Sequence, residues 1–165
     1  MKGRPVGRER RGAVASARLP AAPRPERRAA VDLPDETSIP VRSDADVILA
    51  RQKGRELAAA LGFGPADLTF VATAISELTR NIVLYAKRGL IVLKRIEQNG
   101  NLGIMVVARD DGPGIPNVPR ALESGFSTSG GLGLGLPGVR RLTDEFDIVS
   151  EVGRGTTVTV KKWTR

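Results

Sequence analysis

A run of closely spaced glycines is the clearest chemical signal in this sequence. Gly131, Gly133, Gly135 and Gly138 fall within eight residues and alternate mainly with leucine. Glycine tolerates positive φ and has no Cβ, so successive backbone N–H groups can converge on an anion, and a helix that begins just after them adds its positive end. The run therefore predicts a phosphate site, with a flexible or packing-driven glycine loop as the alternative.

Three smaller polar clusters accompany the glycine run. Glu77 and Asn81 lie four residues apart in a helical pattern, the segment 110–114 (Asp-Asp-Gly-Pro-Gly) directly follows a β-prone run, and Gly-Arg-Gly-Thr occupies 153–156. Taken singly, each cluster can be explained as a solvated helix face or a turn. Their order along the chain is not a common coincidence, and this favours one shared site.

The residue types that are absent limit the chemistry. The chain has neither histidine nor cysteine. An imidazole base, a histidine ligand and a thiolate metal site are therefore excluded, so proton transfer must rest on Asp, Glu, Lys or Tyr. The lack of cysteine fits a cytoplasmic protein. No apolar run has the roughly 18 to 20 residues that cross a bilayer, and we expect no membrane span.

The basic charge is concentrated near the N-terminus. Residues 1–40 carry nine basic and five acidic side chains, which is half of the net charge of +8. Residues 1–36 are mostly Arg, Pro, Ala and Gly with few large apolar groups, so we expect a disordered tail. Such a tail could touch an anionic partner, or remain solvated without one. Residues 37–165 are expected to form one domain, for which no nucleic-acid partner is indicated.

The domain that must position the polar clusters is predicted from periodicity and turn residues. We expect an edge strand at 37–41, helices at about 43–62 and 65–86, a hairpin of 90–93 and 102–107 around Asn99-Gly100, a loop at 115–130 with one helical turn near 119–122, a helix at 137–146, and a closing hairpin of 146–152 and 156–160. This order predicts an α+β two-layer sandwich, with helices on one face of a mixed, mostly antiparallel sheet.

Two of the helices have identifiable apolar stripes. In the first, the expected buried residues are Val47, Ile48, Leu49, Leu57, Ala58 and Leu61. In the second they are Phe70, Val71, Ala74, Ile75, Leu78, Ile82 and Tyr85, and we expect Gly89 to end that helix. Gly54 is expected to weaken the first helix, because glycine is a poor helix former.

In this order the four clusters resemble the motifs of the GHKL, or Bergerat-fold, ATP-binding domains. Residues 77–81 look like the N box of that family, 110–114 like its first glycine box, 131–136 like its second, and 153–156 like its last box. The resemblance covers roughly residues 37–163. It implies the Bergerat fold and ATP as the nucleotide.

Within that superfamily, the segments 77–86 and 131–146 are most similar to anti-sigma-factor serine/threonine kinases of the stressosome switch type. The resemblance implies a kinase that phosphorylates Ser or Thr on STAS-domain scaffold or antagonist proteins, and that then activates a PP2C-type phosphatase. A sigma factor is a further candidate partner. The sequence leaves open whether the protein forms a homodimer.

The resemblance also implies roles for individual residues, and each role is chemically reasonable. A carboxylate at a strand end can accept the exocyclic amine of adenine, which is the role of Asp110. Gly112 and Gly114 would let the backbone approach the ring, and Thr156 would support adenine. Backbone N–H groups at Gly131, Gly133 and Gly135 would hold the phosphates. A mobile lid would reach from about 115 to 136, with 126–129 as its moving part.

Glu77 and Asn81 would then carry the chemistry of transfer. Mg²⁺ prefers oxygen ligands and keeps most of its waters, so the side-chain amide oxygen of Asn81 together with phosphates is a plausible ligand set. Glu77, one turn earlier, can accept the proton of an incoming hydroxyl.

Other kinase and nucleotide-binding classes lack the residues they require. A P-loop would need Gly-Lys-Ser/Thr after the glycines, and a eukaryotic-type kinase would need a His-Arg-Asp loop. The remaining alternative is a non-catalytic, nucleotide-dependent module that sequesters a sigma factor or another partner.

Overall fold

The structure is a computed structural model that describes residues 34–125 and 134–165. The predicted tail lies outside the described residues up to position 33. The same is true of Gly131, Gly133 and the predicted moving part of the lid at 126–129. None of the helices in the described ranges is long and apolar enough to cross a membrane.

Along the described chain, strands and helices follow nearly the predicted order. They are β1 (Glu36–Val41), α1 (Asp44–Ala60), α2 (Pro65–Asn81), the π-helix η1 (Ile82–Ala86), β2 (Gly89–Gln98), β3 (Asn101–Asp110), the short α3 (Val118–Ala121), α4 (Gly135–Leu142), β4 (Glu145–Glu151) and β5 (Gly155–Trp163). The predicted hairpin turn is confirmed, since Asn99 and Gly100 have φ of 52° and 79°. Both residues of such a two-residue turn need positive φ.

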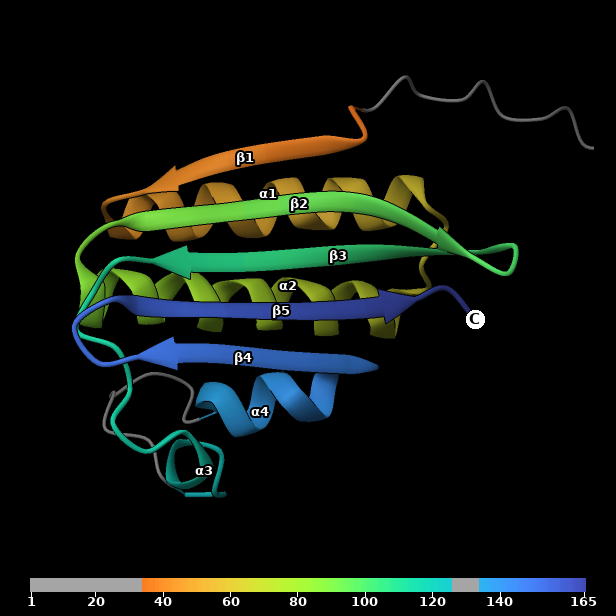
Figure 1. The fold of residues 1–165 in the computed structure, drawn as a ribbon. Coiled ribbons are helices and arrows are strands. Elements are labelled where there is room, and N and C mark those ends of the chain that lie inside the picture. The colour runs from red at the N-terminus through yellow and green to blue at the C-terminus, as the bar shows by residue number, and fades with distance from the viewer. Residues whose placement is uncertain (1–33, 126–133) are drawn as a thin grey trace, which may run out of the picture. The chain divides into compact units, whose positions relative to one another are not determined.

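The strands form one sheet in the order β1-β2-β3-β5-β4, and α1 and α2 lie side by side against one face of it (Figure 1). The predicted α+β two-layer arrangement is confirmed. All four pairings between the described strands are antiparallel, so the parallel component of the expected mixed sheet does not occur among them. Because α1 and α2 together carry the chain out and back, β2 enters the sheet opposite in direction to β1.

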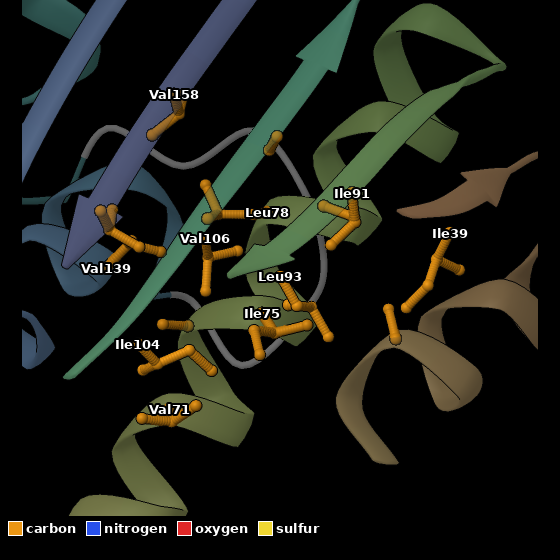
Figure 2. Close-up of a cluster of buried hydrophobic side chains, with 14 of the residues drawn as sticks. Ile39, Val71, Ile75, Leu78, Ile91, Leu93, Ile104, Val106, Val139 and Val158 are labelled. Carbon is orange, nitrogen blue, oxygen red and sulfur yellow. The ribbon is translucent and has the colours of Figure 1, made fainter. Parts of the chain in front are cut away.

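The core lies between the sheet and the helices. Alternate residues of β2, β3 and β5 face α2 and α4, as Figure 2 shows. Its labelled members include Ile91, Leu93, Ile104, Val106 and Val158 from the strands, Val71, Ile75 and Leu78 from α2, and Val139 from α4. Burial therefore alternates along the central strands, as expected for a sheet that is covered by helices on one face.

The buried stripe of α1 differs from the prediction. Ile48 and Leu49 are 59% and 43% exposed, so placing them in the core was wrong. The buried positions are Val47, Ala50, Gly54, Leu57 and Ala58, which follow the three- and four-residue spacing of one helix face. A Cβ at Gly54 would lie 2.0 Å from Cδ1 of Ile75 on α2. Close packing of the two helices therefore accounts for a glycine in mid-helix.

The stripe of α2 is confirmed from Val71 to Ile82, but its two ends are not buried. Phe70 is 38% exposed and Tyr85 is 50% exposed. Tyr85 belongs to η1, whose wider turn rotates it away from the direction that a regular α-helix would give it. The helix ends at Ala86, as predicted, and the residue with positive φ that closes it is Lys87, with φ of 70°, rather than Gly89.

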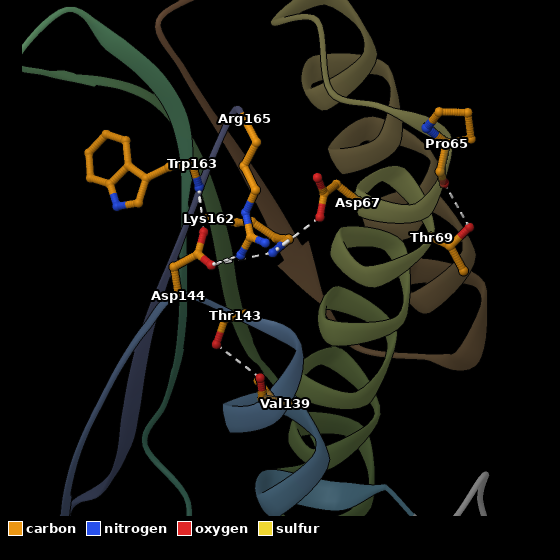
Figure 3. Close-up of polar contacts among 9 residues, drawn as sticks. All are labelled: Pro65, Asp67, Thr69, Val139, Thr143, Asp144, Lys162, Trp163 and Arg165. Atoms are coloured by element: carbon orange, nitrogen blue, oxygen red, sulfur yellow. Dashed lines mark hydrogen bonds and ion pairs between the residues drawn. The ribbon is translucent and has the colours of Figure 1, made fainter.

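The last helix is displaced from its predicted range of 137–146. It spans Gly135–Leu142, and Thr143 closes it by donating its hydroxyl hydrogen to the carbonyl oxygen of Val139 over 2.9 Å (Figure 3). Phe146 belongs to β4, because the alternating pattern of the closing hairpin extends back to residue 145. The hairpin itself is confirmed.

A buried lysine joins the closing hairpin to the start of α2. The side chain of Lys162 is only 5% exposed, and its ammonium lies 3.3 Å from Asp67 and 3.5 Å from Asp144 (Figure 3). Asp144 also accepts the backbone N–H of Trp163 at 2.8 Å and pairs with Arg165 at 3.0 Å. Burial raises the pKa of Asp144, but these hydrogen bonds and the charge of Lys162 together lower it below its ordinary value of 3.8.

Replacing Asp144 by asparagine is expected to lower the free energy of unfolding at pH 7 by about 1–3 kcal/mol, because the buried ammonium loses one of two carboxylate partners. Since the folded pKa is depressed, this stabilisation is present above the ordinary value of 3.8 and is lost as the pH falls through the folded pKa. Urea unfolding at pH 7 and at about pH 3 should therefore show a difference that shrinks with acid.

The exposed Lys53–Glu56 pair supplies the matched control for this experiment, since both side chains are about half exposed. Glu56→Gln should change the free energy of unfolding by less than about 1 kcal/mol. An Asp144→Asn variant with a pH-independent deficit would contradict the assigned role of the carboxylate charge.

Candidate functional site

A cavity of about 240 Å³ lies between the C-terminal end of α2 and the sheet. Its lining residues come from α2 and η1 (Leu78, Asn81, Ile82, Tyr85), from β3 and β5 (Ala108, Asp110, Thr156, Val158), from the segment after β3 (Pro113, Gly114, Ile115, Pro116, Ala121) and from the start of α4 (Gly135, Leu136). The walls are thus largely apolar, with a few polar groups at fixed places. Ligand sites commonly combine these two properties.

Polar side chains cross three neighbouring strands in one row at the cavity. Asp110 on β3 is paired directly with Thr156 on β5, and Thr156 is paired with Ser150 on β4. Directly paired residues of antiparallel strands place their side chains on the same face. The row lies on the face that carries the core, because Ala108 and Val158, two residues before Asp110 and two after Thr156, are both buried.

The carboxylate of Asp110 is held by the turn that follows it. Its Oδ1 accepts the backbone N–H of Gly112 at 2.9 Å. Gly112 itself packs under η1, where an added Cβ would lie 2.6 Å from Cβ of Ala86. One carboxylate oxygen is thereby used to orient the group, and Asp110 lines the cavity with its position fixed.

Two further glycines let the β4–β5 hairpin pack against this turn. At Gly114, φ is +73° and a Cβ would lie 2.3 Å from the carbonyl oxygen of Glu151. At Gly155, φ is +103° and a Cβ would lie 2.0 Å from the carbonyl oxygen of Asp110. The expected roles of Gly112 and Gly114 concerned approach of a ring. In the structure both are also required by contacts within the protein, and of the two only Gly114 lines the cavity in the described part of the chain.

Glu77 is buried at the start of α4. Its Oε2 accepts the backbone N–H of Gly135 at 3.2 Å, and its Oε1 lies 3.4 Å from Nη1 of Arg80. The contact with Gly135 joins α2 to the end of the glycine run across 58 residues of sequence. Glu77 and the last of the predicted phosphate-binding glycines are therefore neighbours, whereas Gly131 and Gly133 lie outside the described residues.

Asn81 lies one helical turn beyond Glu77, and its side chain lines the cavity. The adjoining residues of η1 add Tyr85, which the sequence indicated as core. Its helical spacing from Leu78 and Ile82 suggested burial, and only its hydroxyl hinted at a polar surrounding. Single-turn π-helices of this kind are frequent at functional sites.

Comparison with known proteins connects this geometry to a family. The profile of the histidine kinase-, DNA gyrase B-, and HSP90-like ATPases matches residues 66–164, which include Glu77, Asn81, Asp110 and Thr156. The chain belongs to this ATPase family. The family is the one indicated by the four motifs, so that prediction is confirmed, and membership implies ATP as the nucleotide.

Individual members of the ATPase family are similar over most of the chain. The serine/threonine-protein kinase RsbT of Bacillus subtilis is 48% identical over 131 residues, which are 79% of this chain and 98% of that protein. The anti-sigma F factor of Geobacillus stearothermophilus is 32% identical over 103 residues, which are 58% of this chain and 69% of that protein.

A solved structure shows the same fold. The RsbU and RsbW domains of a Mycobacterium tuberculosis protein match with a TM-score of 0.51 at 22% identity, over 79% of this chain and 33% of that one. The two-layer architecture expected from the GHKL motifs is thus found both in this protein and in a structural relative.

Proposed function

We propose that this chain is an ATP-dependent protein serine/threonine kinase that phosphorylates STAS-domain partner proteins in a bacterial partner-switching pathway. Its sequence similarity to a serine/threonine-protein kinase extends over almost the whole length of that relative. The structural observation that carries the proposal is the placement of Glu77: a buried carboxylate, bonded to the glycine run through Gly135 and one turn from the cavity residue Asn81.

The cavity suits the base of ATP. Leu78, Ile82 and Val158 supply apolar walls for a flat ring. Asp110 uses Oδ1 to accept the N–H of Gly112, and we assign its Oδ2 to the exocyclic amine of adenine. A charge-assisted hydrogen bond inside an apolar cavity is strong and directional, so Asp110 would both bind and orient the base.

We assign the binding of Mg²⁺ to Asn81. Within 34–125 and 134–165, no three His, Cys, Asp or Glu side chains gather in a way that could hold a metal ion. Mg²⁺ is often bound through one or two protein oxygens together with phosphates and water, and the side-chain oxygen of Asn81 fits that pattern. When bound, the ion would neutralise charge on the phosphates.

Glu77 is the residue that would take up the proton during transfer. As the hydroxyl oxygen of a substrate Ser or Thr bonds to the γ-phosphorus of ATP, the bond from that phosphorus to the leaving ADP oxygen breaks, and the hydroxyl proton passes to the Glu77 carboxylate. The N–H of Gly135 holds one oxygen of that carboxylate in place. A positioned base of this kind needs no histidine.

The partners follow from the relatives and remain part of the proposal. We propose that after phosphorylating its STAS partner the chain binds and activates a PP2C-type phosphatase, and that the pathway controls a sigma factor. With such partners, the reaction would take place in the cytoplasm.

The proposal is tested by incubating the full chain with γ-labelled ATP, Mg²⁺ and a purified STAS-domain protein encoded beside it. We expect label on a Ser or Thr of the partner, and no label when Mg²⁺ is chelated. If the chain binds nucleotide but transfers no label to any such partner, the kinase assignment is wrong. The chain would then be a non-catalytic module that sequesters a partner.

A further inference from the structure

We propose that Ser150 is a positioning residue that fixes the hydroxyl of Thr156 as a hydrogen-bond acceptor, and that it thereby makes the cavity select a base with an amino group over one with a carbonyl at the same place. This inference rests on the proposed binding of ATP. It adds a residue outside the four sequence motifs to the determinants of base selectivity.

Ser150 is the centre of a small hydrogen-bond network behind the cavity wall. Its Oγ accepts the backbone N–H of Ile115 at 2.8 Å. The same oxygen lies 2.8 Å from Oγ1 of Thr156 and 3.2 Å from the carbonyl oxygen of Gly155. Ile115 and Thr156 both line the cavity, so the Ser150 hydroxyl forms hydrogen bonds to residues on two sides of it.

The number of hydrogens decides the direction of these bonds. A serine hydroxyl has one hydrogen to donate and two lone pairs to accept with. The carbonyl oxygen of Gly155 can only accept, so Ser150 gives its hydrogen there. In the arrangement that satisfies all three contacts of Ser150, Thr156 donates its hydrogen to Ser150 and fills the second lone pair. The reverse arrangement would leave the Ser150–Gly155 contact without a hydrogen.

The consequence is that Thr156 presents only lone pairs to the cavity. Its partner across the strands is Asp110, whose carboxylate also accepts. Two neighbouring acceptors suit the 6-amino group of adenine, which carries two hydrogens. They disfavour hypoxanthine, because its 6-carbonyl oxygen is also an acceptor. It has no hydrogen to donate to Asp110 or Thr156. Sites built around a substrate N–H discriminate strongly for this reason.

The test measures selectivity rather than affinity alone. Dissociation constants of the full chain for ATP and for inosine triphosphate are determined by competition with a fluorescent ATP analogue. The wild-type chain should prefer ATP. Ser150→Ala frees the Thr156 hydroxyl to rotate and donate, so the ATP preference should fall about 5- to 10-fold, as expected for one redirected hydrogen bond.

Three further variants separate positioning from a general structural role. Thr156→Val removes the acceptor but leaves the Ser150–Ile115 hydrogen bond in place, and it should reduce the preference for ATP by a similar factor. The double variant Ser150→Ala/Thr156→Val should reduce the preference no further. Ser150→Thr keeps the hydroxyl and should retain the preference. Thr157→Val, one residue along on the opposite face of β5, is the control and should leave it unchanged.

Equal loss of affinity for both nucleotides in Ser150→Ala, or additive losses of preference in the double variant, would overturn the role of Ser150. A wild-type chain that binds neither nucleotide would overturn the proposed function, and this inference with it. Because the measurement needs no phosphotransfer, absence of kinase activity alone leaves the result interpretable.

Discussion

Glu77→Gln is expected to reduce phosphotransfer to the proposed STAS partner by about 10²- to 10⁴-fold, the usual contribution of a positioned general base. Glutamine cannot take the proton of the incoming hydroxyl. It keeps a side-chain oxygen of the same size, so the bond from the N–H of Gly135 at 3.2 Å can persist. ATP affinity and melting temperature should therefore stay near the wild-type values.

Single-turnover transfer of labelled phosphate measures the chemical step, and competition with a fluorescent ATP analogue measures binding. Glu56→Gln makes the same chemical change at an exposed position of α1 and should leave both unchanged. Transfer by Glu77→Gln at the wild-type rate would rule out the general-base role. If Glu77→Gln loses both ATP binding and phosphotransfer, this would instead indicate that Glu77 organises the glycine run.

Asp110→Asn should weaken ATP binding by about 10- to 100-fold, because hydrogen bonds to charged groups contribute about 1.5–3 kcal/mol. The asparagine can keep its oxygen on the N–H of Gly112, which Asp110 now holds at 2.9 Å. Its amide then turns an NH₂ group toward the cavity, where a donor would face the adenine amine. Binding of inosine triphosphate should suffer less, since its carbonyl can accept from that NH₂ group.

Asp111→Asn is the matched control for this change. Asp111 is the next residue along the chain and is exposed to solvent, so its replacement should alter ATP affinity less than twofold. A melting temperature of Asp110→Asn close to that of the wild-type chain would show that the Gly112 turn survives. An unchanged ATP affinity in this variant would remove Asp110 from the base-binding site.

Much of the fold was predictable because it is encoded in local patterns. Asn99-Gly100 tolerates the two positive φ values of a tight turn, and the β-prone apolar runs on either side of it favour a hairpin. Proline at the start of α2 and the three- and four-residue spacing from Val71 to Ile82 predict an amphipathic helix. The family motifs added the prediction of a GHKL ATPase domain, and the matching profile confirms that family.

The errors in the helices have a common origin. Ile48 and Leu49 are as apolar as any core residue, but the face of α1 that packs is the one on which Gly54 permits close approach to Ile75. Tyr85 has the spacing of a buried residue in an α-helix, but the chain changes to a π-helix before it. Neither the partner of a helix face nor a change in helix pitch is visible in local periodicity.

The sequence by itself indicated the order of the elements, an α+β sandwich of the GHKL type with a mostly antiparallel sheet, and the polar residues that are candidates for nucleotide chemistry. Only the tertiary structure decided how those residues meet: Glu77 with Gly135 across 58 residues, and Asp110, Thr156 and Ser150 in one row. The buried Lys162 with its two carboxylates was likewise invisible. Local propensity depends on a few neighbouring residues, whereas these contacts depend on strand register and helix packing, which are set by the whole domain at once.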